Sequence, residues 1–188
     1  MTAEAESPHA DGDPIGAQIR QGFHREALAA CAREHGAALG RMCMALLGSQ
    51  AEAEEASQEA LLSAYRAMSS FRGEGTARAW VFGIARKVCA RHLTTRSRRA
   101  QRLRLVHDAT AEADLPDAQV ERGRRARELR GALEELKPSE RETVLLRYQA
   151  GLSFQEVAQA CGIEEAAARK RASRALARLR KILPNEVA

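Results

Sequence analysis

The stretch from Ser139 to Leu183 constrains the fold of this chain most, because it follows the pattern of a helix-turn-helix. Ser153 is a natural helix N-cap, and Glu156 three residues later completes a capping box. Gly162 follows where that helix must stop, at a position that favours glycine because it accepts a positive φ. The pattern predicts two short helices that cross closely. In motifs of this kind the second helix enters the DNA major groove.

The second helix of this motif has two chemically distinct faces at about 100° per residue. One face is an apolar stripe made of Ala168, Ala172, Ala175, Leu176, Leu179, Ile182 and Leu183. The other face gathers the cations Lys170, Arg171, Arg174, Arg178 and Lys181. A solvated amphipathic helix would show the same division. The capped helix and the glycine turn before it favour DNA binding.

The charge of the chain supports a nucleic-acid partner and indicates a second partner as well. The formal net charge is +5 and the sequence pI is about 9.4. Residues 94–104 contain five arginines and no acid, whereas residues 51–60 contain four glutamates and no base. This polarity predicts one anionic and one cationic partner.

Apolar residues recur at helical spacing along most of the chain, and no strand pattern is present. Residues 1–20 carry proline, glycine and acidic residues without periodicity and are expected to be disordered. An arginine-rich stretch and a segment rich in aspartate and alanine then predict a flexible linker over residues 96–120. The expected fold is all-α: two small helical domains, residues 21–95 and 121–188, of which the second is a helix-turn-helix.

Several function classes are not supported by the sequence. The four cysteines are widely spaced, without zinc-site spacing, and are expected to be buried, reduced thiols in a cytoplasmic protein. No apolar run is long enough to span a membrane, and the acidic N-terminus is not a signal peptide. The histidines are scattered, and no catalytic triad or phosphate loop is visible. We therefore expect a protein that is not an enzyme and has no catalytic residue, metal site or cofactor.

A row of carboxylates marks the helix predicted from about residue 51 to residue 68. Glu52, Glu55 and Glu59 share one face, opposite a face that includes Ala60, Leu61, Ala64, Tyr65 and Met68. Like charges in a row repel one another and add nothing to packing. The row is either a solvated face or a docking surface for a basic partner.

The helix predicted from about residue 77 to residue 93 pairs a tryptophan with cations. Trp80, Lys87 and Arg91 line up opposite a broad apolar face. Bases of single-stranded nucleic acid stack on aromatic rings while cations hold the phosphates. Alternatively, Trp80 folds under the preceding loop as a core residue, and both interpretations can be partly true.

These segments, in this order, resemble an extracytoplasmic-function (ECF) sigma factor of the bacterial sigma-70 family. The similar stretches are residues 48–67, 70–93 and 132–163, followed by the basic helix. The combination of Phe71-Arg72-Gly73-Glu74-Gly75 with Ala79-Trp80 is highly specific. The resemblance implies a promoter-specificity subunit that binds core RNA polymerase, directs transcription initiation and is controlled by an anti-sigma factor.

The resemblance also implies roles for particular residues. Residues 21–95 would be sigma region 2 and residues 121–188 sigma region 4. Docking on the clamp coiled coil of the polymerase β′ subunit is implied for Glu52, Glu55, Gln58 and Glu59. Reading of the minus-ten promoter element is implied for Phe71, Arg72, Trp80, Lys87 and Arg91. Reading of the minus-thirty-five element is implied for Arg169, Lys170, Arg171, Arg174 and Arg178. The other implied partners are the β flap, promoter DNA and the anti-sigma factor, without membrane insertion.

Two rival functions remain for a chain with this sequence. A stand-alone transcriptional regulator would use the same helix-turn-helix, with the N-terminal helices as a dimerisation or sensing module. Such a module has no need for a tryptophan on a basic face or for an acidic docking row. A nucleic-acid enzyme such as a recombinase needs catalytic residues with partners, and none is visible in the sequence.

Overall fold

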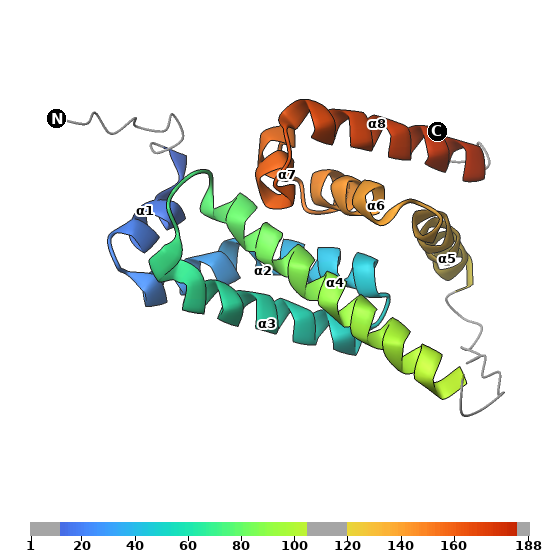
Figure 1. Ribbon diagram of the computed structural model, residues 1–188, viewed down its shortest axis with the longest axis horizontal. Helices are drawn as coiled ribbons and strands as arrows, with labels where there is room; N and C mark the ends of the chain where they lie inside the picture. The colour runs from blue at the N-terminus through green and yellow to red at the C-terminus, as the bar shows by residue number, and fades with distance from the viewer. Residues whose placement is uncertain (1–11, 105–119, 184–188) are drawn as a thin grey trace.

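The computed structural model describes residues 12–104 and 120–183, which form helices, turns and loops without a strand (Figure 1). This confirms the all-α prediction. The elements are α1 (Pro14–Arg20), α2 (His24–Leu47), α3 (Gln50–Ala67), η2 (Met68–Ser70), α4 (Ala77–Arg104), α5 (Val120–Glu134), α6 (Pro138–Val144), η4 (Leu145–Gln149), α7 (Phe154–Cys161) and α8 (Glu165–Ile182). We call α1–α4 the N-terminal bundle and α5–α8 the C-terminal bundle.

The turn between α2 and α3 is built from a glycine and a serine. Gly48 ends α2 with a φ of 75°, and its N–H donates to the Met44 carbonyl over 2.9 Å. The Ser49 hydroxyl then caps α3 by accepting a hydrogen bond from the Glu52 N–H. The chain therefore reverses over two residues, and α3 packs back against α2.

Small side chains allow the helices of the N-terminal bundle to pack closely. Helix α3 buries the row Ala53, Ala56, Ala60 and Ala64. Larger buried side chains from the neighbouring helices, Leu39 and Met42 on α2 and Phe82 on α4, fill the core. Tyr65, which the sequence placed on the core face of α3, is 37% exposed.

The cysteines are all free, as predicted. Cys31, Cys43 and Cys89 are buried, and Cys161 is half-buried. Burial raises the pKa of the Cys31 thiol to about 11. The Sγ atoms of Cys43 and Cys89 lie 3.5 Å apart, so the two thiols form a polar contact between α2 and α4 inside the core.

The prediction of disorder over residues 1–20 is wrong for its second part, because residues 14–20 form α1. Ile15 and Ile19 of this helix are buried in the core. The Asp13 carboxylate accepts from the Gly16 N–H over 2.9 Å and from the Ala77 N–H over 2.6 Å, so it ties the start of α1 to the start of α4. Residues 1–11 lie outside the described residues.

The predicted linker over residues 96–120 is also wrong at its first end. Helix α4 continues to Arg104, well beyond the expected stop near residue 93. Arg96 anchors this extension, because its Nη1 donates to the Leu47 carbonyl over 2.9 Å. Arginine is a good helix former, so the basic stretch extends the helix. Residues 105–119 lie outside the described residues.

The helix-turn-helix has the predicted local structure. Ser153 and Glu156 form the reciprocal capping box of α7, and Gly162 ends that helix with a φ of 66°. Helix α8 buries Ala168, Ala172, Ala175 and Leu179 of the predicted apolar stripe. Helix α6 begins with Pro138 at its first position, directly after Lys137.

The two bundles pack directly against each other (Figure 1). Helix α7 contacts α4, and η4 contacts α2. In Figure 1, α6 and α7 lie between the N-terminal bundle and α8, so α8 forms the outer edge of the molecule.

Candidate nucleic-acid and protein interfaces

The basic face of α8 is open to solvent. Lys170 and Arg174 are exposed, and Arg171 is half-buried. Alanines 168, 172 and 175 on the opposite side are buried against α6 and α7. The fold therefore presents this face outward, as a helix that enters a DNA groove requires.

Two of the five residues predicted to read the minus-thirty-five element have partners within the protein. Arg169 pairs with Glu165 one turn earlier, with 3.0 Å between its Nε and the Glu165 Oε1, and its guanidinium lies 4.7 Å from the centre of the Phe154 ring. The Arg178 Nε lies 3.8 Å from the Glu140 Oε2. Glu140 is buried, and α8 thereby supplies a cation to it. Lys170 and Arg174 remain the residues best placed to meet phosphates or bases.

The loop before α4 forms a pocket around the single tryptophan. The Phe71 and Trp80 rings pack at 5.1 Å between centroids with a tilt of 53°. The loop pocket has a volume of about 310 Å³ and is lined by Ser70, Phe71, Arg72, Glu74, Gly75, Thr76, Trp80 and Gln159. Trp80 is half-buried. It therefore supports the loop, as the core interpretation expects, and it also lines the pocket, while the stacking of bases on its ring stays a prediction.

The remaining cations predicted to read the minus-ten element differ from one another in their surroundings. Lys87 is exposed on α4. Arg72 is exposed and lies 3.9 Å from Glu74. Arg91 is engaged: its Nη2 donates to the Glu59 Oε1 over 2.6 Å. The predicted row Trp80, Lys87 and Arg91 exists on α4, but one end of it is bound to α3.

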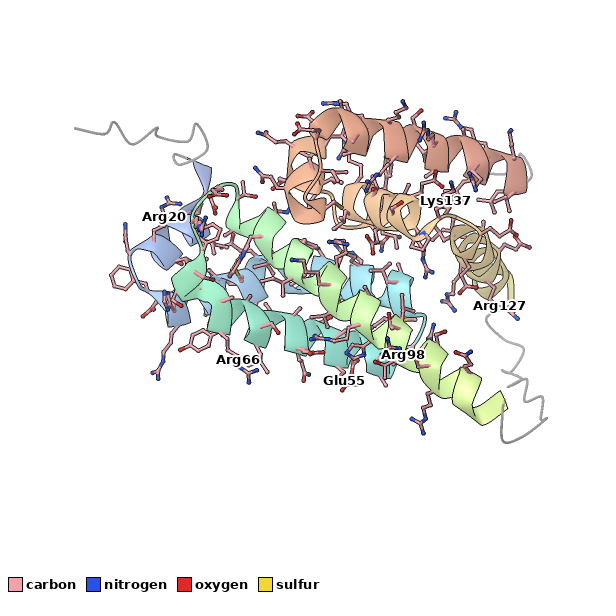
Figure 2. All side chains as sticks on the ribbon, viewed as in Figure 1. Arg20, Glu55, Arg66, Arg98, Arg127 and Lys137 are labelled. Carbon is pink, nitrogen blue, oxygen red and sulfur yellow. The ribbon has the colours of Figure 1, made fainter. Side chains whose placement is uncertain are left out.

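The acidic residues of α3 are only partly available to a partner. Glu52 pairs with Arg96 over 3.1 Å, and Glu59 pairs with Arg91 and with the His92 Nε2 over 2.9 Å. Glu55 and Gln58 are exposed. Figure 2 shows Glu55 on the outer side of α3, pointing away from the C-terminal bundle. The basic residues of α4 thus neutralise part of the predicted docking row.

Sequence reasoning missed the residues that join the two bundles. Arg86 on α4 donates to the Glu142 Oε2 on α6 over 3.0 Å, and both side chains are mostly buried. The Arg141 Nη2 donates to the carbonyls of Ala45 and Leu46 on α2, over 3.1 and 2.7 Å. Contacts between segments so far apart in the chain leave no periodic signal in the sequence.

A cluster of histidine, cysteine or acidic residues that could hold a metal ion is absent from the part of the chain that the structure describes. In that same part, no helix is both long and apolar enough to cross a membrane.

Each of the two bundles matches the model of a known protein family. Residues 31–99 match the model of sigma-70 region 2, and residues 126–179 match the model of sigma-70 region 4. The chain is 30% identical over 141 residues to the ECF RNA polymerase sigma factor SigC of Mycobacterium tuberculosis, covering 70% of each protein. The chain belongs to the ECF sigma factors. The region 2 match runs from within α2 to within α4, and the region 4 match runs from within α5 to within α8.

Other relatives of this sigma factor agree with that assignment. The ECF sigma factor BldN of Streptomyces coelicolor is 31% identical over 147 residues, and the match spans 74% of this sigma factor and 54% of BldN. The solved structure of CnrH in complex with the cytosolic domain of CnrY superposes with a TM-score of 0.66 at 25% identity, covering 89% of this chain and 94% of CnrH. The structure of RpoE in complex with the anti-sigma factor NepR from Bartonella quintana superposes with a TM-score of 0.62 at 25% identity. The match covers 88% of this chain and 99% of RpoE.

Proposed function

We propose that this sigma factor binds core RNA polymerase in the cytoplasm and directs it to a small set of promoters, without performing chemistry itself. One observation carries the proposal: both sigma regions occur in one chain, region 2 over residues 31–99 and region 4 over residues 126–179. Residues 21–95 and 121–188 serve as the two functional domains. A stand-alone regulator would use the helix-turn-helix with a dimerisation or sensing module, and it would have no need for sigma region 2.

Region 4 reads duplex DNA through α8. Lys170 and Arg174 contact the minus-thirty-five element first, because they are exposed on α8, the helix at the outer edge of the molecule. Arg171 contributes from a half-buried position, while Arg169 and Arg178 must exchange Glu165 and Glu140 for DNA. Region 4 also contacts the polymerase β flap.

Region 2 opens and reads the minus-ten element through the loop pocket and α4. The pocket offers the Trp80 ring and loop polar groups to an unstacked base, while Arg72 and Lys87 hold phosphates near it. Arg91 joins them when Glu59 turns to the polymerase. The docking face for the β′ clamp coiled coil centres on Glu55 and Gln58, which are exposed, with Glu52 and Glu59 at its edge.

An anti-sigma factor controls this sigma factor. Support comes from relatives: one similar structure is a sigma factor bound to the anti-sigma factor NepR, and another is CnrH bound to the cytosolic domain of CnrY. A groove of about 770 Å³ between the bundles offers a mostly apolar surface, with Met44, Leu133, Leu145 and Leu176 in its lining. Leu129 and Tyr148, which also line it, are 46% and 56% exposed. An amphipathic helix of the inhibitor would cover these side chains.

Co-purification with polymerase tests this function. The tagged chain, expressed in its native cell, should retain the β and β′ subunits. A Lys170→Ala/Arg174→Ala variant is the matched control, because it should retain polymerase and lose promoter DNA. Capture of DNA without any polymerase subunit would support the stand-alone regulator instead.

A further inference from the structure

The first helix of the helix-turn-helix packs on the helix that carries the proposed minus-ten contacts. Gly83 of α4 meets the backbone of α7: a Cβ added at this glycine would lie 3.0 Å from the Ala160 carbonyl oxygen and 3.3 Å from its Cα. Ala79 and Ala160 are buried. Helices α4 and α7 therefore approach as closely as small residues allow (Figure 1).

Polar contacts surround this close approach on both sides. The Arg78 Nη2 donates to the Ala150 carbonyl over 2.8 Å, and its Nη1 lies 3.6 Å from the Glu156 Oε2. The Thr76 hydroxyl donates to the Glu156 Oε1 over 3.1 Å. Arg86 of α4 and Glu142 of α6 form a further, mostly buried ion pair between the bundles. The capping glutamate of α7 is thus also a contact between the bundles.

Gln159 of α7 reaches into the loop pocket of region 2. A Cβ added at Gly75 would lie 2.5 Å from both the Cδ and the Oε1 of Gln159, so the amide lies directly on this glycine. The Gln159 Oε1 is buried, and no hydrogen-bond donor reaches it among the residues that the structure describes. A buried amide oxygen without a donor costs free energy, which lowers the net stability of this contact between the bundles.

This arrangement cannot read both promoter elements at once. Elements named for positions about 25 base pairs apart lie about 85 Å apart along B-DNA, at about 3.4 Å for each base pair. Helices α4 and α7 touch each other. The bundles must therefore separate before one sigma factor can occupy both elements.

We propose that α7 inhibits region 2 within the free chain: Gln159 forms one wall of the loop pocket against Gly75, and the ion pairs of Arg78 and Arg86 hold it there until polymerase separates the bundles. The proposal rests on the proposed function of the loop pocket. The basic face of α8 stays open meanwhile, so the free chain keeps its affinity for duplex DNA while α7 restricts the access of single-stranded DNA to the loop pocket.

The test uses the full-length free chain and separates opening from binding. Glu142→Arg replaces the buried pair by repulsion against Arg86, and Glu135→Arg makes the same charge change at an exposed site outside the interface. Trp80 is the single tryptophan, so acrylamide quenching of its fluorescence reports access to the loop pocket. Spin labels at Arg66→Cys and Ser173→Cys, in a Cys161→Ser background, report the separation of the bundles.

Glu142→Arg should lengthen the spin-label distance and increase quenching of Trp80. It should also bind a mixed-sequence single-stranded DNA of about 12 nucleotides about tenfold more tightly than Glu135→Arg does, because the binding-competent fraction rises. The Arg86→Glu/Glu142→Arg exchange should return all three values toward those of the wild type. Gln159→Ala should increase quenching and single-strand affinity without a change in distance.

A lengthened distance with unchanged quenching and single-strand affinity would overturn the proposal, and so would a wild-type chain whose bundles are already apart. If Glu142→Arg does not fold, Gln159→Ala decides alone, and unchanged quenching and affinity in that variant would reject the pocket contact. None of these measurements uses polymerase. A failed co-purification would therefore reject the sigma function without changing the conclusion on the contact between the two bundles.

Discussion

Arg91 on α4 donates to Glu59 on α3 over 2.6 Å, so a residue proposed to read promoter DNA is bound to one proposed to dock on polymerase. His92 contacts the other oxygen of the same carboxylate over 2.9 Å. Polymerase that takes Glu59 would release Arg91 toward the minus-ten element. We therefore propose that the pair links core binding to DNA binding within region 2.

The two glutamates at this face should respond differently to reversal of their charge. Glu55→Lys should change the free energy of unfolding by no more than about 0.5 kcal/mol, because the residue is exposed. Glu59→Lys should cost about 1 kcal/mol, since it replaces an ion pair by repulsion from Arg91. Both variants should bind core polymerase more weakly, with a deficit that shrinks at high salt.

Urea denaturation and a core-binding titration measure the two effects separately. The Glu59→Arg/Arg91→Glu exchange should recover stability but not polymerase binding. Wild-type affinity of Glu55→Lys for core at low salt would show that the docking surface lies elsewhere.

Single alanine substitutions at the two exposed cations of α8 should weaken the binding of promoter DNA. Lys170→Ala and Arg174→Ala should each weaken binding of promoter duplex and lower the salt slope by about one unit if the contact is to phosphate. A residue bidentate to guanine would instead cost about 1–3 kcal/mol at one base position. Ser173→Ala, an exposed neutral change on the same helix, is the control. Footprints that are unchanged in both basic variants would contradict the role of α8.

The aromatic pair in the loop pocket should affect both stability and strand opening. Phe71→Ala should destabilise region 2 by about 1 kcal/mol through loss of the packing against Trp80. Lys87→Ala should leave stability unchanged within about 0.5 kcal/mol, because Lys87 is exposed, and should still reduce open-complex formation. Thermal unfolding and permanganate footprinting of promoter thymines measure these effects. Normal strand opening in a folded Trp80→Ala variant would mean that the ring only supports the loop.

Much of this arrangement follows from local sequence signals. The capping box of Ser153, the glycine stop at Gly162 and the apolar stripe of α8 each depend on residues within one or two turns, so the sequence predicts them. Helix α1 escaped prediction because its two buried isoleucines are too few to show a period, and its cap, Asp13, acts partly on the distant Ala77.

The partners of the site residues within the protein could not be predicted from the sequence. The face that carries Glu52 and Glu59 is visible as a pattern, but their partners Arg96 and Arg91 lie on another helix. The contact of Gln159 with Gly75 depends on how the two bundles pack, which no helical periodicity encodes.

The stability of the protein should fall in mild acid because of His35. Burial and, after it, the positive charge of Arg78 lower the pKa of this histidine, which packs beside Phe82 at 6.4 Å between ring centroids. The unfolded chain therefore takes up its proton near pH 6.5 while the folded chain stays neutral. The stabilisation is complete above about pH 6.5 and is lost as the pH falls through the lower folded pKa.

Urea denaturation of the wild type and His35→Gln between about pH 7.5 and 5 checks this, because glutamine cannot take up the proton. The wild type should lose more free energy of unfolding than the variant over this range. Parallel pH profiles would show that His35 does not respond differently in the folded and unfolded chains.

Run-off transcription with purified core polymerase tests whether this chain directs polymerase to promoters. Core polymerase from the native cell would be incubated with genomic DNA, with and without this sigma factor, and the 5′ ends of the transcripts would be sequenced. We expect new starts at a small set of sites that share elements near minus-ten and minus-thirty-five, and we expect the Lys170→Ala/Arg174→Ala variant to lose them. Transcription no different from that of core polymerase alone would contradict it.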